Sequence, residues 1–314
     1  MTGRDDAMVV ATMSSPRKPT ALFSSVLCPV DFSEHSRVAL RYAALVADRS
    51  RAELTALFVN DPMLVAAAAA AYDKRVLTAQ SQTELERFVE ATLGAGRQRD
   101  VETVVLVGEP AHEIIKSAKK LRAEIIVVGS EGLSGARKVF FGSTTARLLS
   151  ETAVPVLAVP PDDSGSPSDR WPGPRVMAAI DLERSAARDV AAAAKIARWF
   201  GARLILVHIV EKTTVPRWLS LKAGPIDRER VAKARARLER LGHAALPEGP
   251  PDVHVLAGNA ADQISTLASD VGAGLVILTL RGNNRLLGDR KGATTYRVMR
   301  EAGVPVLAVP DGYL

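Results

Sequence analysis

Residues that could bind an anion gather between positions 125 and 145, in the stretch IIVVGSEGLSGARKVFFGSTT. Four apolar residues, Ile125 to Val128, are typical of a buried parallel strand, and Gly129 follows them directly. Gly132 comes next, and Gly142 precedes two hydroxyl residues and a stretch that looks helical. Glycines let backbone N–H groups approach a ligand closely, and a helix start presents unpaired donors and the positive end of its dipole. The stretch therefore predicts a phosphate-binding loop.

The side chains around these glycines could add to such a loop. Ser143 and Thr144 offer hydroxyl donors, and Arg137 and Lys138 lie inside the loop. The two basic side chains could reach phosphates or could simply be solvated, and both interpretations stay open. Glycines can also serve plain turns, but their spacing between an apolar strand and a helix favours phosphate binding.

The elements that would position this loop alternate along the first half of the chain. Strands are predicted at 25–30, 54–59, 101–107, 125–128 and 154–159, and helices at 34–49, 76–94, 110–121 and 146–150. Residues 60–74 contain an alanine run and are predicted to form a loop or lid. Strands that alternate with helices imply a parallel, doubly wound α/β sheet.

The second half of the chain repeats the first. Asp181 lies 150 residues after Asp31, and the segment VPVLAVP occurs at 154–160 and again, unchanged, at 304–310. An identical segment at a constant offset indicates two copies of one domain, because the period has the size of a whole domain.

The composition along the chain sets the predicted domain boundaries. Residues 1–22 are rich in Met, Ser, Thr and Pro and are predicted to be a flexible leader. Residues 161–174 are dense in Pro, Gly, Ser and Asp and are predicted to be a linker. The two domains are then 23–160 and 175–314.

The spacing Gly129-x2-Gly132-x9-Gly142-Ser143 is similar to the G-x2-G-x9-G-S/T signature of the nucleotide-binding branch of the universal stress protein family. The resemblance covers nearly the whole chain apart from the leader and the linker. It implies two tandem Rossmann-like domains, each a five-stranded parallel sheet of order 3-2-1-4-5 flanked by helices. It also implies that ATP, with Mg²⁺, binds outside the carboxyl ends of strands 1 and 4.

The family resemblance also bears on assembly. Paired domains of this family commonly meet through their fifth strands, and VPVLAVP would be an apolar edge strand liable to self-pairing. We therefore predict an internal pseudo-dimer of the two halves, with a homodimer of whole chains possible through the same fifth-strand edges.

The resemblance assigns nucleotide contacts to matching positions of the first half. These are Pro29, Asp31, Val59, Gly129, Ser130, Gly132, Gly142, Ser143 and Thr144. Asp31, at the carboxyl end of the first strand, would bond an adenine amine or a ribose hydroxyl. A strand-end Asp can instead cap the following helix, but the glycine loop downstream favours ligand contact.

The second half departs from this pattern. A degenerate second site would comprise Asp181, Ile209, Gly282, Gly292 and Thr294. Thr279 stands in the place of Gly129, and Ala293 in the place of Ser143. Threonine has a Cβ where the backbone should approach the ligand, and alanine has no hydroxyl. We expect this half to bind nucleotide weakly or not at all.

Composition and charge narrow the class of protein. The chain has 314 residues, 47% of them hydrophobic, with a net charge of +6 and 4% aromatic residues. Its basic residues are scattered and stacking platforms are few, which argues against a nucleic-acid partner. The chain has neither an apolar run long enough for a bilayer nor a signal-peptide pattern, and a single cysteine, Cys28, excludes an intramolecular disulfide. A cytoplasmic protein with no membrane contact is expected.

The sequence lacks the common catalytic and metal-binding motifs. The chain has no P-loop lysine, no G-x-G-x-x-G after the first strand and no G-x-S-x-G, and its five histidines lack metal-ligand spacing. Cys28 and His208 are predicted to be packed residues. We therefore expect no catalytic residues, no metal held by the protein alone, and a regulatory or signalling role in stress response through an unknown protein partner. The alternatives are a weak ATPase, for which Glu131 is the one candidate carboxylate, and a nucleotide-free interaction or scaffold protein.

Overall fold

A computed structural model describes residues 21–62, 65, 74–98, 100–129, 143–161, 167–211, 223–280 and 293–313. The strands of the first half are β1 (Ser25–Val30), β2 (Glu53–Asn60), β3 (Val101–Val107), β4 (Ile125–Gly129) and β5 (Val156–Val159). Its helices are α1 (Glu34–Ser50), α3 (Lys74–Leu93), α4 (Ala95–Gln98), α5 (Pro110–Lys120) and α6 (Ser143–Glu151). The strands of the second half are β6 (Arg175–Ala179), β7 (Arg203–Val210), β8 (Asp252–Ala257), β9 (Val276–Leu280) and β10 (Val306–Pro310). Its helices are α7 (Ala186–Phe200), α8 (Ala223–Ala245), α9 (Ala260–Asp270) and α10 (Ala293–Glu301).

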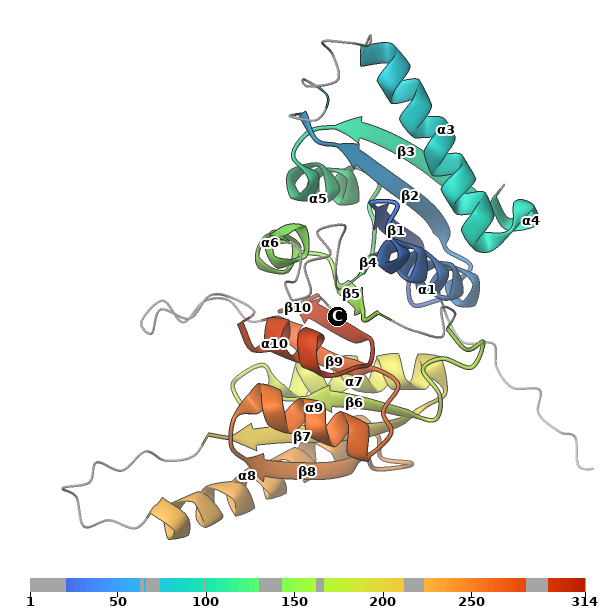
Figure 1. The fold of residues 1–314 in the computed structure, drawn as a ribbon. Helices are drawn as coiled ribbons and strands as arrows, with labels where there is room; N and C mark the ends of the chain where they lie inside the picture. Colours follow the sequence, from blue (N-terminus) through green and yellow to red (C-terminus); the bar gives the residue numbers. More distant parts are fainter. Residues whose placement is uncertain are drawn as a thin grey trace, which may run out of the picture.

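The strands form one ten-stranded sheet in the order β3-β2-β1-β4-β5-β10-β9-β6-β7-β8. Each half has the predicted order 3-2-1-4-5, and all pairs within a half are parallel. The halves join where β5 and β10 pair in antiparallel fashion, with Leu157 opposite Leu307, in the middle of the molecule (Figure 1). The predicted internal pseudo-dimer through the fifth strands is confirmed.

This junction leaves no free edge on either fifth strand. β5 is flanked by β4 and β10, and β10 by β5 and β9, so the backbone groups on both sides of each strand face a neighbour. The prediction that whole chains could form a homodimer through these edges is therefore wrong. The outer edges of the sheet are β3 and β8.

Helices cover both faces of the sheet and divide the core into two layers. One layer contains buried side chains of α1, α3, α7 and α8, and the other contains those of α5, α6, α9 and α10. Successive strand residues enter opposite layers: Val26 and Cys28 lie in the first layer and Leu27 in the second. Cys28 is fully buried, and burial raises the pKa of its thiol well above its usual range, so the prediction of a packed thiol is confirmed.

The described end of the predicted linker packs between the two halves. The ring centroid of Trp171 lies 5.0 Å from that of Tyr42 in α1 and 5.1 Å from that of Phe200 in α7. Its indole Nε1 donates to the carbonyl oxygen of Gly274 at 2.9 Å, where any Cβ would collide with the carbonyl oxygen of Pro172. A segment with the composition of a linker therefore contributes a partly buried aromatic residue that packs against the core.

Two further contacts tie the halves together. The guanidinium of Arg49 in α1 donates to the carbonyl oxygen of Phe200 at 2.8 Å and lies over the rings of Trp199 and Phe200. The hydroxyl of Tyr313, near the C-terminus, donates to the carbonyl oxygen of Glu124 at 2.7 Å. Burial and the charge of Glu124 raise the pKa of Tyr313 to about 12.

Within the described ranges, no helix combines the length and apolar character that crossing a bilayer requires.

Candidate functional site

The predicted site residues of the first half that the structure describes lie at one edge of the sheet. Pro29 and Asp31 are at the carboxyl end of β1, Val59 is near that of β2, and Gly129 ends β4. β1 pairs in parallel with both β2 and β4, so the three strand ends lie side by side. Ser143 begins α6 and Thr144 follows it. Helix α6 packs beside α5, and the two helices cover the same face of the sheet in the first half (Figure 1).

The turn after β1 is fixed by its own side chains. Oδ1 of Asp31 accepts from the backbone N–H of Ser33 at 3.1 Å and from its hydroxyl at 2.5 Å. Ser33 is the N-cap of α1, and its Oγ accepts from the backbone N–H of Ser36. Phe32, between Asp31 and Ser33, has a φ of 64° in the left-handed region. The alternative in which Asp31 caps α1 is thus wrong: Ser33 is the cap, and the Asp31 carboxylate holds Ser33 in place.

Gly129 has a steric role that the sequence did not reveal. A Cβ at this position would lie 2.8 Å from the carbonyl oxygen of His35, in the first turn of α1. The missing side chain therefore allows β4 and α1 to approach each other. In the second half α7 begins at Ala186, two residues later in the 150-residue repeat than α1 at Glu34, and Thr279 occupies the place of the glycine. The glycine thus occurs in the half whose helix starts earlier, and the threonine in the half whose helix starts later.

A charged pair beside α6 was missed at the level of sequence. Glu109 is the N-cap of α5, and its carboxylate accepts from the backbone N–H groups of Ala111 and His112. Nη1 of Arg147, in the second turn of α6, lies 2.8 Å from Oε2 of Glu109. The one signal for this pair is the repeat, since Arg297 stands 150 residues after Arg147. The start of α5 and the second turn of α6 are thereby joined.

The second half carries different chemistry at the corresponding edge. Asp181 follows β6, Ile209 lies in β7 and Thr294 lies in α10. The guanidinium of Arg237 donates to the carbonyl oxygens of Leu182 and Glu183, at 2.7 and 3.0 Å. Nδ1 of His208 donates to the carbonyl oxygen of Ile180 at 2.8 Å. Side chains of the protein itself therefore bind the backbone that follows β6.

Several predicted site residues lie outside the described residues. These are Ser130, Gly132, Gly142, Gly282 and Gly292, together with Arg137, Lys138 and Glu131. Among the described residues, no three or more His, Cys, Asp or Glu side chains are grouped to hold a metal ion.

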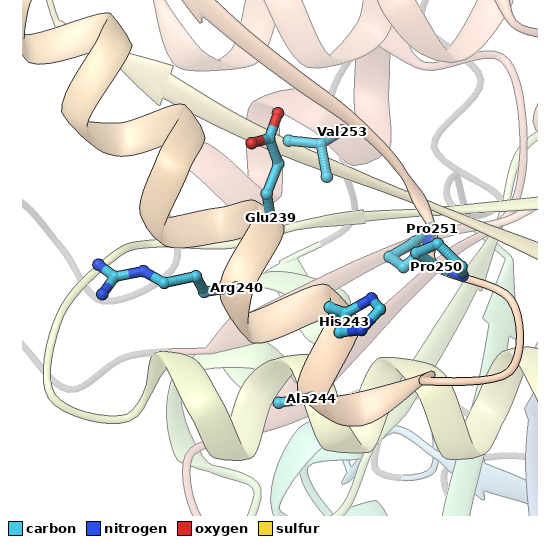
Figure 2. A pocket seen from close by; sticks show the side chains of 7 residues that line it. All are labelled: Glu239, Arg240, His243, Ala244, Pro250, Pro251 and Val253. Carbon is cyan, nitrogen blue, oxygen red and sulfur yellow. The ribbon is translucent and has the colours of Figure 1, made fainter.

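One described surface groove lies at the outer edge of the second half. It is lined by Glu239, Arg240, His243, Ala244, Pro250, Pro251 and Val253. Figure 2 shows that these side chains come from the last turns of α8 and from the segment that enters the edge strand β8. The groove contains no predicted site residue and none of the groups described above.

The doubled sheet, with parallel strands of order 3-2-1-4-5 in each half, defines a tandem α/β protein of Rossmann-like architecture. The model of the universal stress protein family matches residues 23–160 and 174–310, and the chain belongs to this family. A universal stress protein of Mycolicibacterium smegmatis is 29% identical over 294 residues, which cover 90% of this chain and 96% of that protein.

Solved structures share the same fold. A universal stress protein from Archaeoglobus fulgidus has a TM-score of 0.60 at 22% identity, covering 92% of this chain and 98% of its own. A universal stress protein described as putative, from Pseudomonas aeruginosa, has a TM-score of 0.61 at 17% identity, covering 92% of this chain and 94% of its own. The tandem arrangement of the two domains therefore recurs in whole relatives.

Proposed function

We propose that the first domain binds ATP, with Mg²⁺, and that the bound nucleotide governs the association of this protein with a regulatory partner in the cytoplasm. One observation carries the proposal: in the first half, the carboxyl ends of β1, β2 and β4 adjoin one another beneath helices α5 and α6. In open α/β sheets ligands bind at such an edge, where the strand order reverses. The signature spacing from Gly129 to Ser143 supplies the phosphate-binding character.

Each group has a role in this proposal. The Asp31 carboxylate, oriented by its bonds to Ser33, would bond the adenine amine or a ribose hydroxyl. The first N–H groups of α6, with the Ser143 and Thr144 hydroxyls, would bind phosphate oxygens, because the start of a helix has unpaired donors. Gly132 and Gly142 would let the backbone of the loop approach the phosphates. Mg²⁺ would enter with the nucleotide and be held mainly by phosphate oxygens and water.

The second domain is proposed as a structural partner that binds nucleotide weakly or not at all. The carbonyl oxygens after β6 are already bound by Arg237, and Ala293 replaces the Ser143 hydroxyl. We expect one nucleotide per chain.

Regulation is favoured over catalysis by the side chains of the first site. The Asp31 carboxylate is bonded within the turn after β1, and the Glu109 carboxylate is bonded to α5 and paired with Arg147. Both carboxylates are thus held by groups of the protein itself. Efficient ATP hydrolysis is therefore not expected.

The test begins with freshly purified protein. Denaturation followed by mass spectrometry identifies any nucleotide carried, and calorimetry measures ATP binding to the emptied protein. Gly142→Val should abolish binding. Gly96→Val should leave it intact, because nothing lies within 4 Å of a Cβ at position 96.

Three results would count against the proposal. Absence of bound nucleotide together with absence of binding on titration would indicate a scaffold protein. Two equivalent tight sites per chain would contradict the assignment of the second domain. Phosphate release well above background and lost in Gly142→Val would indicate an ATPase.

A further inference from the structure

We propose that Glu109 and Arg147 set the preference of the first site between nucleoside triphosphates and diphosphates. In this mechanism the Arg147 guanidinium exchanges the Glu109 carboxylate for the terminal phosphate of a bound triphosphate. The inference rests on the proposed function, since it concerns the same site, and it assigns a specificity role to two residues outside the signature spacing.

The position of Arg147 on α6 brings its charge near the start of that helix. Arg147 stands four residues after Ser143, and helical side chains lean toward the N-terminus, over the preceding turn. Its two contacts span α6: Nη1 lies 2.8 Å from Oε2 of Glu109 at the start of α5, while Nε lies 3.3 Å from Oε1 of Glu151 in the last turn of α6. The guanidinium therefore lies between the start of α5 and the side of α6.

A positively charged side chain at this place needs a negative partner. A helix N-terminus carries a partial positive charge, so a guanidinium beside the start of α5 is disfavoured unless a negative group accompanies it. Glu109 is that group, because its Oε2 accepts from both the His112 N–H and Arg147. A terminal phosphate could replace the carboxylate with more charge and with oxygens that suit the two-pronged guanidinium.

Exposure makes the exchange feasible. The side chains of Arg147 and Glu109 are 46% and 48% exposed, and ion pairs exposed to this degree hold their partners weakly. After Glu109 separates from Arg147, its carboxylate would still accept hydrogen bonds from the Ala111 and His112 N–H groups. The carboxylate would therefore keep hydrogen-bond partners.

The second half shows what the pair does without a phosphate role. Arg297 lies 2.8 Å from Oδ1 of Asp262 and 3.3 Å from Oδ1 of Asn259, the neutral N-cap of α9. The docking of one helix on the other is thus common to both halves. The N-cap of α5 is a carboxylate, whereas that of α9 is neutral. In the proposed mechanism, this carboxylate competes with the incoming phosphate for Arg147.

The experiment measures dissociation constants of ATP and ADP, with Mg²⁺, by calorimetry on the full chain. For Glu109→Gln we expect the ratio of ATP to ADP affinity to rise roughly 3- to 10-fold, the size of a partly exposed ion-pair effect. For Arg147→Met we expect the ratio to fall by a similar factor with ADP affinity nearly unchanged. Asp262→Asn and Arg297→Met are the matched controls and should leave the ratio as it is in the wild type.

Thermal unfolding of all four variants separates a binding effect from loss of fold. Variants of Glu109 and Arg147 that shift the ratio no more than their controls would overturn this inference and leave the pair as a helix-docking contact. In that case wild-type binding of both nucleotides keeps the proposed function intact. A wild-type protein that binds neither nucleotide would overturn both proposals together.

Discussion

Substitution of Gly129 by alanine tests whether this glycine serves helix packing or ligand approach. The added Cβ would lie 2.8 Å from the carbonyl oxygen of His35, 2.9 Å from its carbonyl carbon and 3.1 Å from its Cβ. Two of these atoms are backbone, so relief requires α1 and β4 to move apart. Because α1 also carries Arg49, which contacts Phe200 in the second half, such a shift would also disturb the contact between the two halves.

The magnitude follows from the cost of overpacking. Inserting a methyl group into a tightly packed place costs about 1–3 kcal/mol, offset by about 0.4–1 kcal/mol because alanine restricts the unfolded chain. A net loss of about 1–2 kcal/mol remains. At about 2–4 °C per kcal/mol for a domain of this size, Gly129→Ala should lower the unfolding temperature by several degrees.

The assay is thermal unfolding without added nucleotide, followed by ATP titration. Thr279→Ala is the matched control: it changes the equivalent residue of the second half, where the helix begins two residues later, and should shift the unfolding temperature far less. A Gly129→Ala protein as stable as the wild type that has lost ATP binding would refute the packing argument. It would restore the view that the glycine admits the ligand.

Three further predictions concern the core and the junction of the halves. Trp171→Ala should destabilise the protein by about 2–4 kcal/mol, since the indole fills the space between Tyr42 and the second half, and denaturant unfolding should then separate into two transitions. Tyr313→Phe should cost about 1 kcal/mol at pH 7 through loss of the bond to Glu124. The Tyr313 pKa is raised from 10.0 to about 12, so the unfolded chain ionises first, and stability relative to Tyr313→Phe should be lost as pH rises from about 10 to 12. Cys28 should resist thiol reagents at pH 8 in the native protein and react fully on unfolding; prompt native reaction would contradict its burial.

The fold was largely predictable because its determinants are local and repeated. Apolar runs marked the strands, and the second VPVLAVP segment marked the duplication, since both are readable from neighbouring residues. The junction followed from the same segment: an apolar fifth strand needs a partner, and its copy supplies one. That pairing also removed the edge through which a homodimer was predicted, a consequence that required the sheet order to be known.

The site was predictable as a location but not as a set of contacts. Asp31 and Val59 were correctly placed at strand ends, yet the cap of α1 proved to be Ser33, because capping depends on the φ/ψ path through Phe32. The ion pair of Glu109 and Arg147 joins residues 38 apart in a chain whose linear pattern shows only scattered charges.

The sequence by itself determined the α/β alternation, the duplication and the family signature, because strand periodicity, repeats and glycine spacing are properties of the chain in one dimension. Only the tertiary structure decided why Gly129 and Gly274 lack side chains, and why a linker tryptophan packs against the core. These depend on how closely helices, strands and a distant segment approach one another. Such distances arise only when the whole sheet is assembled, and each of them joins residues far apart in the sequence.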